Sequence, residues 1–251
     1  MHIGNPRQIV YGSFDTGSSL SWFKCNQPIE KLGCANNNED SLPRQLYADD
    51  PKFSYCISSD LSQINVLLFG PEAKIQGQPG PMFRNMFNDN YFIDLLAITV
   101  NNERLDVLPS VFQMSDSGTR GFIVDSGSTS TWLTSVAFEA MKKKMVQMFG
   151  RPPIQYTVQG SVHFEICYES RKFIDGRPPV IGFQFVNYLL EIEESNMWYK
   201  IPDSTLQCLI ILDGKNDTIS ILGSYQLLDV NVGYDPNKGA LYFDKIKCPN
   251  P

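Results

Sequence analysis

The sequence has only two histidines, His2 and His163, and neither has an acidic or cysteine cluster around it. We therefore expect surface or hydrogen-bonded strand positions for both, and no metal site. The chain also lacks any Cys-x-x-Cys pair, any Gly-x-Ser-x-Gly sequence and any glycine-rich phosphate loop. These absences argue against a zinc ribbon, an α/β-type serine hydrolase and a nucleotide-binding protein. No cofactor is predicted.

A basic surface and a long apolar run are also absent. The formal net charge of the 251 residues is -6, which does not favour a nucleic-acid partner. No apolar run approaches the length that spans a bilayer, so no membrane span is expected. The start of the chain, Met1-His2-Ile3-Gly4, lacks the layout of a signal peptide.

One motif occurs twice, at residues 14–22 and again at residues 124–132. Each copy follows an apolar run and contains Asp, a small hydroxyl residue, Gly, Ser and a second hydroxyl residue. Each ends on a tryptophan, Trp22 or Trp132, for which we expect a mainly structural role in the core, although Trp22 could wall a subsite. One Asp-Thr-Gly is a common turn, but two long matching copies indicate a pair of related loops.

The two loops carry the groups that a carboxylate-pair enzyme needs. Glycine allows a sharp turn and a close approach of two backbones. If the loops face each other, Asp15 and Asp125 come together, and such a pair shares one proton over a wide acidic range. One carboxylate then acts as a general base and the other as a general acid. The hydroxyl groups available to donate hydrogen bonds to the carboxylates are those of Thr16, Ser18, Ser126 and Ser128.

Further segments occur in the order found in one protein family. They are residues 3–8, 52–56, 68–70, 91–95, 221–224 and 232–235. With the two Asp motifs, they make the chain resemble the pepsin-like aspartic endopeptidases, and among them the plant nepenthesin-type enzymes. The resemblance covers nearly the whole chain.

This resemblance implies a mostly β, two-lobed acid protease fold. The N-terminal lobe would be residues 1–89 and the C-terminal lobe residues 90–251. Asp15 and Asp125 would be the catalytic pair, and the segment 221–223 would support the Asp125 loop. The residues implied to brace the pair are Thr16, Gly17, Ser18, Ser126, Gly127 and Ser128. An extended peptide or protein would be the substrate of a monomer from an extracellular, vacuolar or other secretory compartment.

Six cysteines without a metal-type spacing favour disulfides, and sequence alone leaves 15 connectivities. The resemblance implies Cys167 with Cys208 and Cys56 with Cys248, which leaves Cys25 with Cys34. Reduced thiols remain the alternative at this point.

Local patterns predict many strands and few helices. A helix over residues 135–149 follows from its apolar spacing, with Val136, Met141, Met145 and Met148 on its apolar side. A short helix is expected at 41–47 and a helical turn at 225–228. Strands are expected at 53–57, 64–69, 91–100, 105–107, 180–185, 189–192, 197–201, 206–212, 219–222, 231–234 and 240–244.

The first half departs from the family pattern. Only 110 positions separate Asp15 from Asp125. Between Cys34 and Ser41 there is neither a glycine-flanked hairpin with a tyrosine nor an apolar-apolar-Gly segment. We therefore expect an internal deletion that removes the flap over the substrate. Three functions stay open: a weak aspartic endopeptidase, a non-catalytic homologue that binds another protein or acts as an inhibitor, and a poorly folded truncation.

Overall fold

The computed structural model describes residues 2–3, 8–9, 11–17, 22–24, 42–85, 88–158, 162–215 and 218–248. Within them the helices are α1 (Leu42–Leu46), α2 (Ser135–Phe149) and α3 (Glu194–Met197). The strands of the first half are β1 (His2–Ile3), β2 (Gln8–Ile9), β3 (Tyr11–Ser13), β4 (Trp22–Lys24), β5 (Phe53–Cys56), β6 (Val66–Phe69), β7 (Gln78–Asn85), β8 (Asn88–Ile93), β9 (Leu95–Val100), β10 (Glu103–Arg104) and β11 (Gly121–Asp125). Those of the second half are β12 (Thr131–Leu133), β13 (Ile154–Thr157), β14 (His163–Glu169), β15 (Ile181–Phe185), β16 (Leu189–Glu191), β17 (Trp198–Lys200), β18 (Leu206–Leu209), β19 (Ile211–Asp213), β20 (Ile219–Gly223), β21 (Val230–Asp235) and β22 (Ala240–Lys245).

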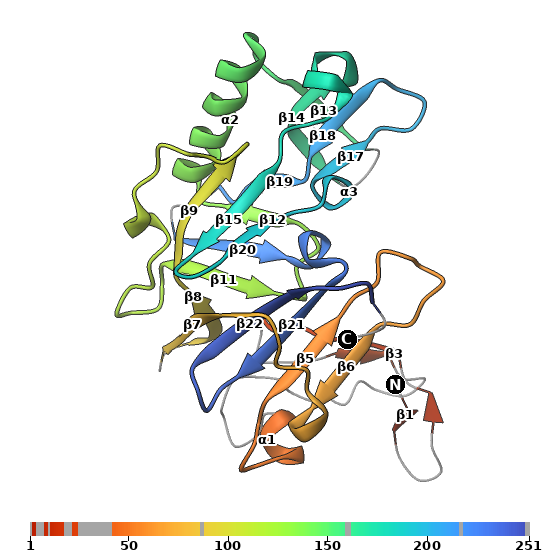
Figure 1. Cartoon of the computed structure of the whole chain (residues 1–251), viewed down its shortest axis with the longest axis vertical. Helices are drawn as coiled ribbons and strands as arrows, with labels where there is room; N and C mark the ends of the chain where they lie inside the picture. The colour runs from red at the N-terminus through yellow and green to blue at the C-terminus, as the bar shows by residue number, and fades with distance from the viewer. Residues whose placement is uncertain are drawn as a thin grey trace.

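The largest sheet of the described structure has ten strands, in the order β19-β12-β20-β11-β8-β7-β22-β21-β5-β6. Its last strands in sequence, β21 and β22, lie between the early strands β5 and β7, as Figure 1 shows where the blue strands lie beside the orange ones. The sheet therefore joins the chain's C-terminal strands to its first third. The predicted lobe boundary after residue 89 falls within β8 and stays a prediction.

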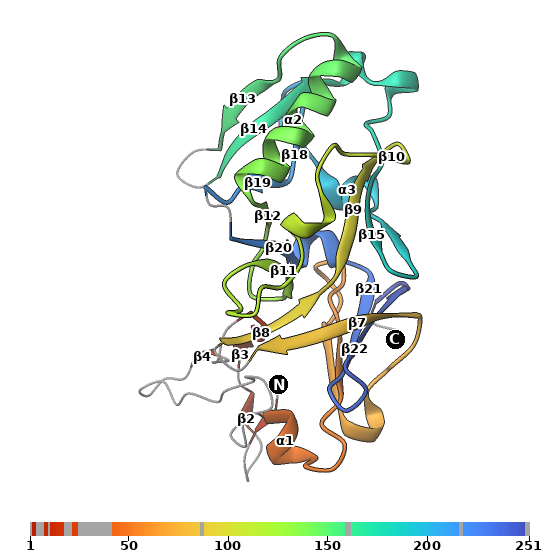
Figure 2. The same cartoon turned by 90° about the vertical axis from the view of Figure 1, so that its left-hand side faces the viewer.

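Two smaller sheets and α2 complete the part of the chain after β8. Their strand orders are β10-β9-β15-β16 and β13-β14-β18-β17, and Figure 2 shows α2 running alongside them. The helix buries Ala137, Phe138, Met141 and Met145 on one face, and Gly150, at φ 63°, ends it with a left-handed cap. The predicted bounds are confirmed, but Val136 is exposed, because the buried face lies one residue further along.

Both disulfides implied for the described cysteines are present. Cys56 on β5 is bonded to Cys248 after β22, and Cys167 on β14 to Cys208 on the neighbouring strand β18. The predicted bond between Cys25 and Cys34 lies outside the described residues. The first bond ties the C-terminal segment to the β5 edge of the large sheet.

Most predicted strands are confirmed, but residues 91–100 and 206–212 each form two strands that belong to different sheets, β8 with β9 and β18 with β19. Residues 105–107 are not a strand, since the hairpin after β9 uses Glu103–Arg104 instead. Trp132 is 37% exposed rather than in the core, because alternation along β12 buries its neighbours Thr131 and Leu133. The side chain of Trp22 lies outside the description. No helix among the described residues has the length and apolarity to cross a membrane.

Candidate active site

The two Asp loops face each other and are joined by reciprocal hydrogen bonds. The backbone N–H of Thr16 donates to Ser126 Oγ (3.1 Å), and the N–H of Ser126 donates to Thr16 Oγ1 (3.0 Å). Each hydroxyl also donates to the residue before the Asp of the opposite loop, from Thr16 to the carbonyl of Val124 (3.1 Å) and from Ser126 to that of Phe14 (2.7 Å). Thr16 is buried. The hydroxyl residue after each Asp therefore fixes the register of the two loops.

Each aspartate lies against the glycine of the opposite loop. A Cβ added to Gly17 would overlap the carboxylate of Asp125, and one added to Gly127 would overlap that of Asp15. Each glycine N–H also donates to the carboxylate of its own loop, to Asp15 at 3.0 Å and to Asp125 at 2.8 Å. The geometry thus brings the two carboxylates that the sequence singles out into one site.

The electrostatics of the site suit a shared proton. Burial raises the pKa of Asp125 to about 6, the N–H of Gly127 opposes that rise, and the nearby Asp15 carboxylate adds to it. A carboxyl with that pKa keeps its proton through most of the acidic range. Asp125 is therefore suited to supply the proton of an acid–base pair.

The segment after β19 supports the second loop as predicted. Strand β20 runs parallel to β11, with Gly223 opposite Asp125 and Leu222 opposite Val124. A Cβ at Gly223 would strike the carbonyl of Ser130, so the strand can pass this close only as glycine.

Ser128 acts differently from its expected role, and Ser18 lies outside the described residues. The Ser128 hydroxyl donates to the carbonyl of Ser130 (3.0 Å), and a hydroxyl has only one hydrogen to give. The backbone N–H of Ser128, rather than its side chain, lowers the pKa of Asp125. Sequence reasoning also missed Tyr234, whose hydroxyl lies 3.4 Å from Thr16 Oγ1.

Other candidate sites do not overlap the dyad. Among the described residues no three His, Cys, Asp or Glu side chains are grouped to hold a metal ion, and His163 is hydrogen bonded to Thr157 on the surface. Two cavities of about 350 and 310 Å³ lie elsewhere, one lined by Asn196 and Asp229 and the other by Arg120 and Thr134. The dyad therefore remains the strongest candidate site.

Comparison with known families agrees with this geometry. The family model described as Xylanase inhibitor C-terminal matches residues 90–245. The chain belongs to this family. Its curated relatives include aspartic proteinase nepenthesin-2 of Nepenthes gracilis, 31% identical over 83% of this chain and 48% of that protein, and nepenthesin-1 of the same plant, 26% identical over 94% of this chain and 58% of that protein. The chain is thus a homologue of pepsin-like plant aspartic proteinases and spans about half the length of these relatives.

Solved structures with the same fold carry other names. One is edgp, with a TM-score of 0.69 and 19% identity over 88% of this chain and 61% of that one. Another is the basic 7S globulin from soybean, with a TM-score of 0.66 and 18% identity over 90% and 61% of the two chains. At these identities the likeness shows the mostly β fold alone.

The raised pKa of Asp125 predicts a stability term that depends on pH. The folded-state pKa lies above the ordinary value of 3.8, at about 6, so the stabilising contribution is complete below about pH 4 and is lost as pH rises through 6. Since Asn cannot ionise, Asp125→Asn should become more stable relative to wild type across this window. Allowing for the partial exposure of Asp125, we expect the free energy of unfolding of Asp125→Asn to gain about 1–2 kcal/mol over that of wild type across this window. Urea unfolding at several pH values measures the gain.

Asp213 provides a control of opposite sign. Burial acts to raise its pKa, but hydrogen bonds from Lys215 and Ser135 lower the pKa overall. Asp213→Asn should therefore lose stability relative to wild type as pH rises above about 4. Equal pH dependence in wild type and Asp125→Asn would contradict the raised pKa.

Proposed function

We propose that this chain is an aspartic-type endopeptidase that hydrolyses peptide bonds at acidic pH through Asp15 and Asp125. The observation that carries the proposal is the pair of carboxylates, each packed against the glycine of the opposite loop. The braces between Thr16 and Ser126 support it, because they hold the two loops in one register.

The chemistry needs only the two carboxyl groups and a water molecule. The ionised carboxylate takes a proton from water as the oxygen attacks the peptide carbonyl carbon, while the protonated carboxyl gives its proton to the carbonyl oxygen. The C–N bond then breaks as the departing nitrogen receives a proton from one carboxyl, while a hydroxyl of the tetrahedral intermediate returns its proton to the other and the carbonyl re-forms. The raised pKa of Asp125 supports Asp125 as the initial proton donor, which leaves Asp15 as the proposed base.

We further propose that activity is weak because the first lobe lacks its flap and its support strand. Among the described residues, β3, which leads to Asp15, pairs only with β4. By contrast, β11, which leads to Asp125, pairs with β20 and β8. The spacing of 110 residues between the aspartates also supports a deletion. Without a flap, the two carboxylates are more exposed to solvent and the substrate is held less firmly. Misplacing a substrate by about 1 Å can lower the rate roughly 10²-fold.

An oxidising compartment of the secretory route fits the two disulfides of the described chain. Extended peptides or unfolded proteins are the proposed substrates, and a monomer is the proposed state.

The second candidate function is a non-catalytic scaffold that binds another protein. The name of the matching family, which refers to a xylanase inhibitor, favours it. The retained pair of aspartates favours the enzyme, because a pure binder has no need of both.

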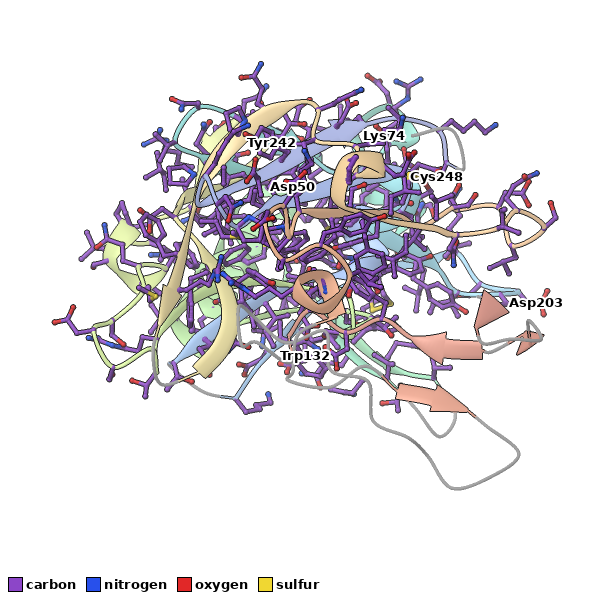
Figure 3. The ribbon with its side chains drawn as sticks, turned by 90° about the horizontal axis from the view of Figure 1, so that it is seen from below. Asp50, Lys74, Trp132, Asp203, Tyr242 and Cys248 are labelled. Carbon is purple, nitrogen blue, oxygen red and sulfur yellow. A yellow bond between two sulfur atoms is a disulfide. The ribbon has the colours of Figure 1, made fainter. Side chains whose placement is uncertain are left out.

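The decisive experiment is cleavage of a denatured protein by the purified chain at about pH 3–5. We expect weak cleavage that a statine-type transition-state mimic blocks and that Asp125→Asn abolishes. Asp203→Asn is the matched control, since Asp203 is exposed at the edge of the molecule (Figure 3) with a φ of 55° that Asn also tolerates. No cleavage by wild type would favour the scaffold, and cleavage as fast as that of nepenthesin-type relatives would refute the proposed effect of the deletion.

A further inference from the structure

Tyr234 is a fully buried tyrosine that lies beneath the first Asp loop. It belongs to β21 and is 0% exposed. Its hydroxyl donates a hydrogen bond to Thr16 Oγ1, at 3.4 Å and across 218 positions of sequence. The bond links the large sheet directly to the loop that carries Asp15.

This bond completes the hydrogen bonding of Thr16. A hydroxyl has one hydrogen and two acceptor positions. The Thr16 hydroxyl donates to Val124 and accepts from the N–H of Ser126 and from Tyr234. Among the described residues, the equivalent hydroxyl of Ser126 makes two bonds, one to the carbonyl of Phe14 and one from the N–H of Thr16. The bond from Tyr234 is therefore an anchor that acts on the first Asp loop, whereas Ser224 anchors the second loop through the carbonyl of Ser128.

The position of the Tyr234 ring is set by the sheet and by its aromatic neighbours. Tyr234 is paired with Phe53 on β5, and the two rings stack at 4.4 Å and 11°. Tyr91 packs edge-on against the same ring at 4.8 Å. Because both neighbours are themselves buried, packing restricts the side-chain torsions of Tyr234 and holds its hydroxyl in one position.

We propose that Tyr234 is a positioning residue that holds Thr16, and through it Asp15, at the separation from Asp125 that catalysis requires. The inference rests on the proposed function, since it concerns the same dyad. It matters most for the first loop, because β3 has β4 as its one pairing partner among the described strands.

The hydroxyl is suited to this role over the whole working range of pH. Burial raises the pKa of Tyr234 well above its usual value, so the group remains a donor. If the anchor is removed, the first loop can withdraw. The Asp125 carboxyl then gains water and loses part of the repulsion from Asp15, which are two of the causes that raise its pKa.

Tyr55 offers a matched control in the same aromatic cluster. It is 3% exposed, its ring centroid lies 6.2 Å from that of Tyr234, and its hydroxyl interacts with the Tyr234 hydroxyl rather than with Thr16. Tyr55→Phe and Tyr234→Phe thus remove the same buried group, but only the second removes a bond to Thr16.

The test is a pH titration of the Asp side-chain carboxyl carbons by NMR in wild type, Tyr234→Phe and Tyr55→Phe, with Asp125→Asn to assign the signal. In Tyr234→Phe, the pKa of Asp125 should fall from about 6 toward the ordinary 3.8, and it should stay near wild type in Tyr55→Phe. Where activity is measurable, kcat should fall about tenfold in Tyr234→Phe with little change in KM.

The outcomes separate this inference from the proposed function. If wild type is inactive but the pKa of Asp125 still changes in Tyr234→Phe, the positioning role is supported and the proposed endopeptidase function is refuted. If wild type is active and the two Tyr→Phe variants have the same Asp125 pKa and the same cleavage rate, the positioning role is overturned and the proposed endopeptidase function is retained. A fall in melting temperature of equal size in both variants, without a change in titration, would also overturn it.

Discussion

The double variant Cys56→Ser/Cys248→Ser is expected to lose about 5 kcal/mol of unfolding free energy under non-reducing conditions. The bond closes a loop with a sequence separation of 192 residues, and chain-entropy models give more stabilisation to longer loops. Because a domain's total stability is about 5–15 kcal/mol, such a loss would bring the chain close to unfolding.

Strand β5 keeps its pairing with β21 and β6 in the variant, but the segment after β22 loses its covalent link to β5. Cys56 ends β5, and among the described residues the segment after β22 is held there through Asp229, which accepts from the N–H groups of Ile246 and Cys248 and donates its own N–H to Ile57. Loss of the disulfide should therefore free the chain end first and the β5–β6 edge next. Hydrogen exchange should show this order.

The second disulfide is the internal comparison. Cys167 and Cys208 are 41 positions apart on neighbouring strands that stay hydrogen bonded without the disulfide. The entropic estimate for Cys167→Ser/Cys208→Ser is about 4 kcal/mol. Chemical unfolding of both double variants should therefore rank the first as less stable. The reverse rank would show that native-state contacts, rather than loop length, set the contribution of these bonds.

Much of the second half could be predicted because its signals are local. The helix 135–149 repeats its apolar residues at helical spacing and ends at Gly150. Gly223 lies opposite Asp125, as the family resemblance implied for the segment 221–223.

Other features escaped because their cause is not local. Strand β7 contains Pro79, Gly80 and Pro81, which discourage a strand assignment, yet pairing with β22 and β8 on its two sides stabilises it. The bond from Tyr234 to Thr16 joins residues 218 positions apart, and no pattern in either segment indicates it.

Some errors were avoidable. The segment 163–169 alternates around buried Phe164 and Ile166, a period-2 signal that predicts β14. The same period would have placed Trp132 on the face opposite Thr131 and Leu133, and thus outside the core.

Gly127→Ala is expected to reduce proteolysis by at least about 10²-fold, because the new methyl group would occupy the position of the Asp15 carboxylate. Gly127 has no left-handed φ, so the backbone accepts alanine and the cost is the collision alone. The carboxylate must move away from Asp125, which breaks the shared-proton geometry. Displacing packed groups in this way should also cost about 1–3 kcal/mol of stability.

A double-mutant cycle identifies the collision as the cause. Asp15→Ala removes the group that the methyl would strike, so Gly127→Ala should cost much less stability in the Asp15→Ala background than in wild type. Activity should be absent in both Asp15→Ala chains, which separates the steric effect from catalysis. Gly17→Ala should behave in the same way toward Asp125, since a Cβ at Gly17 would overlap the Asp125 carboxylate. Urea unfolding of the four chains measures the coupling, and additive stability changes would show that Gly127 and Asp15 are not in contact.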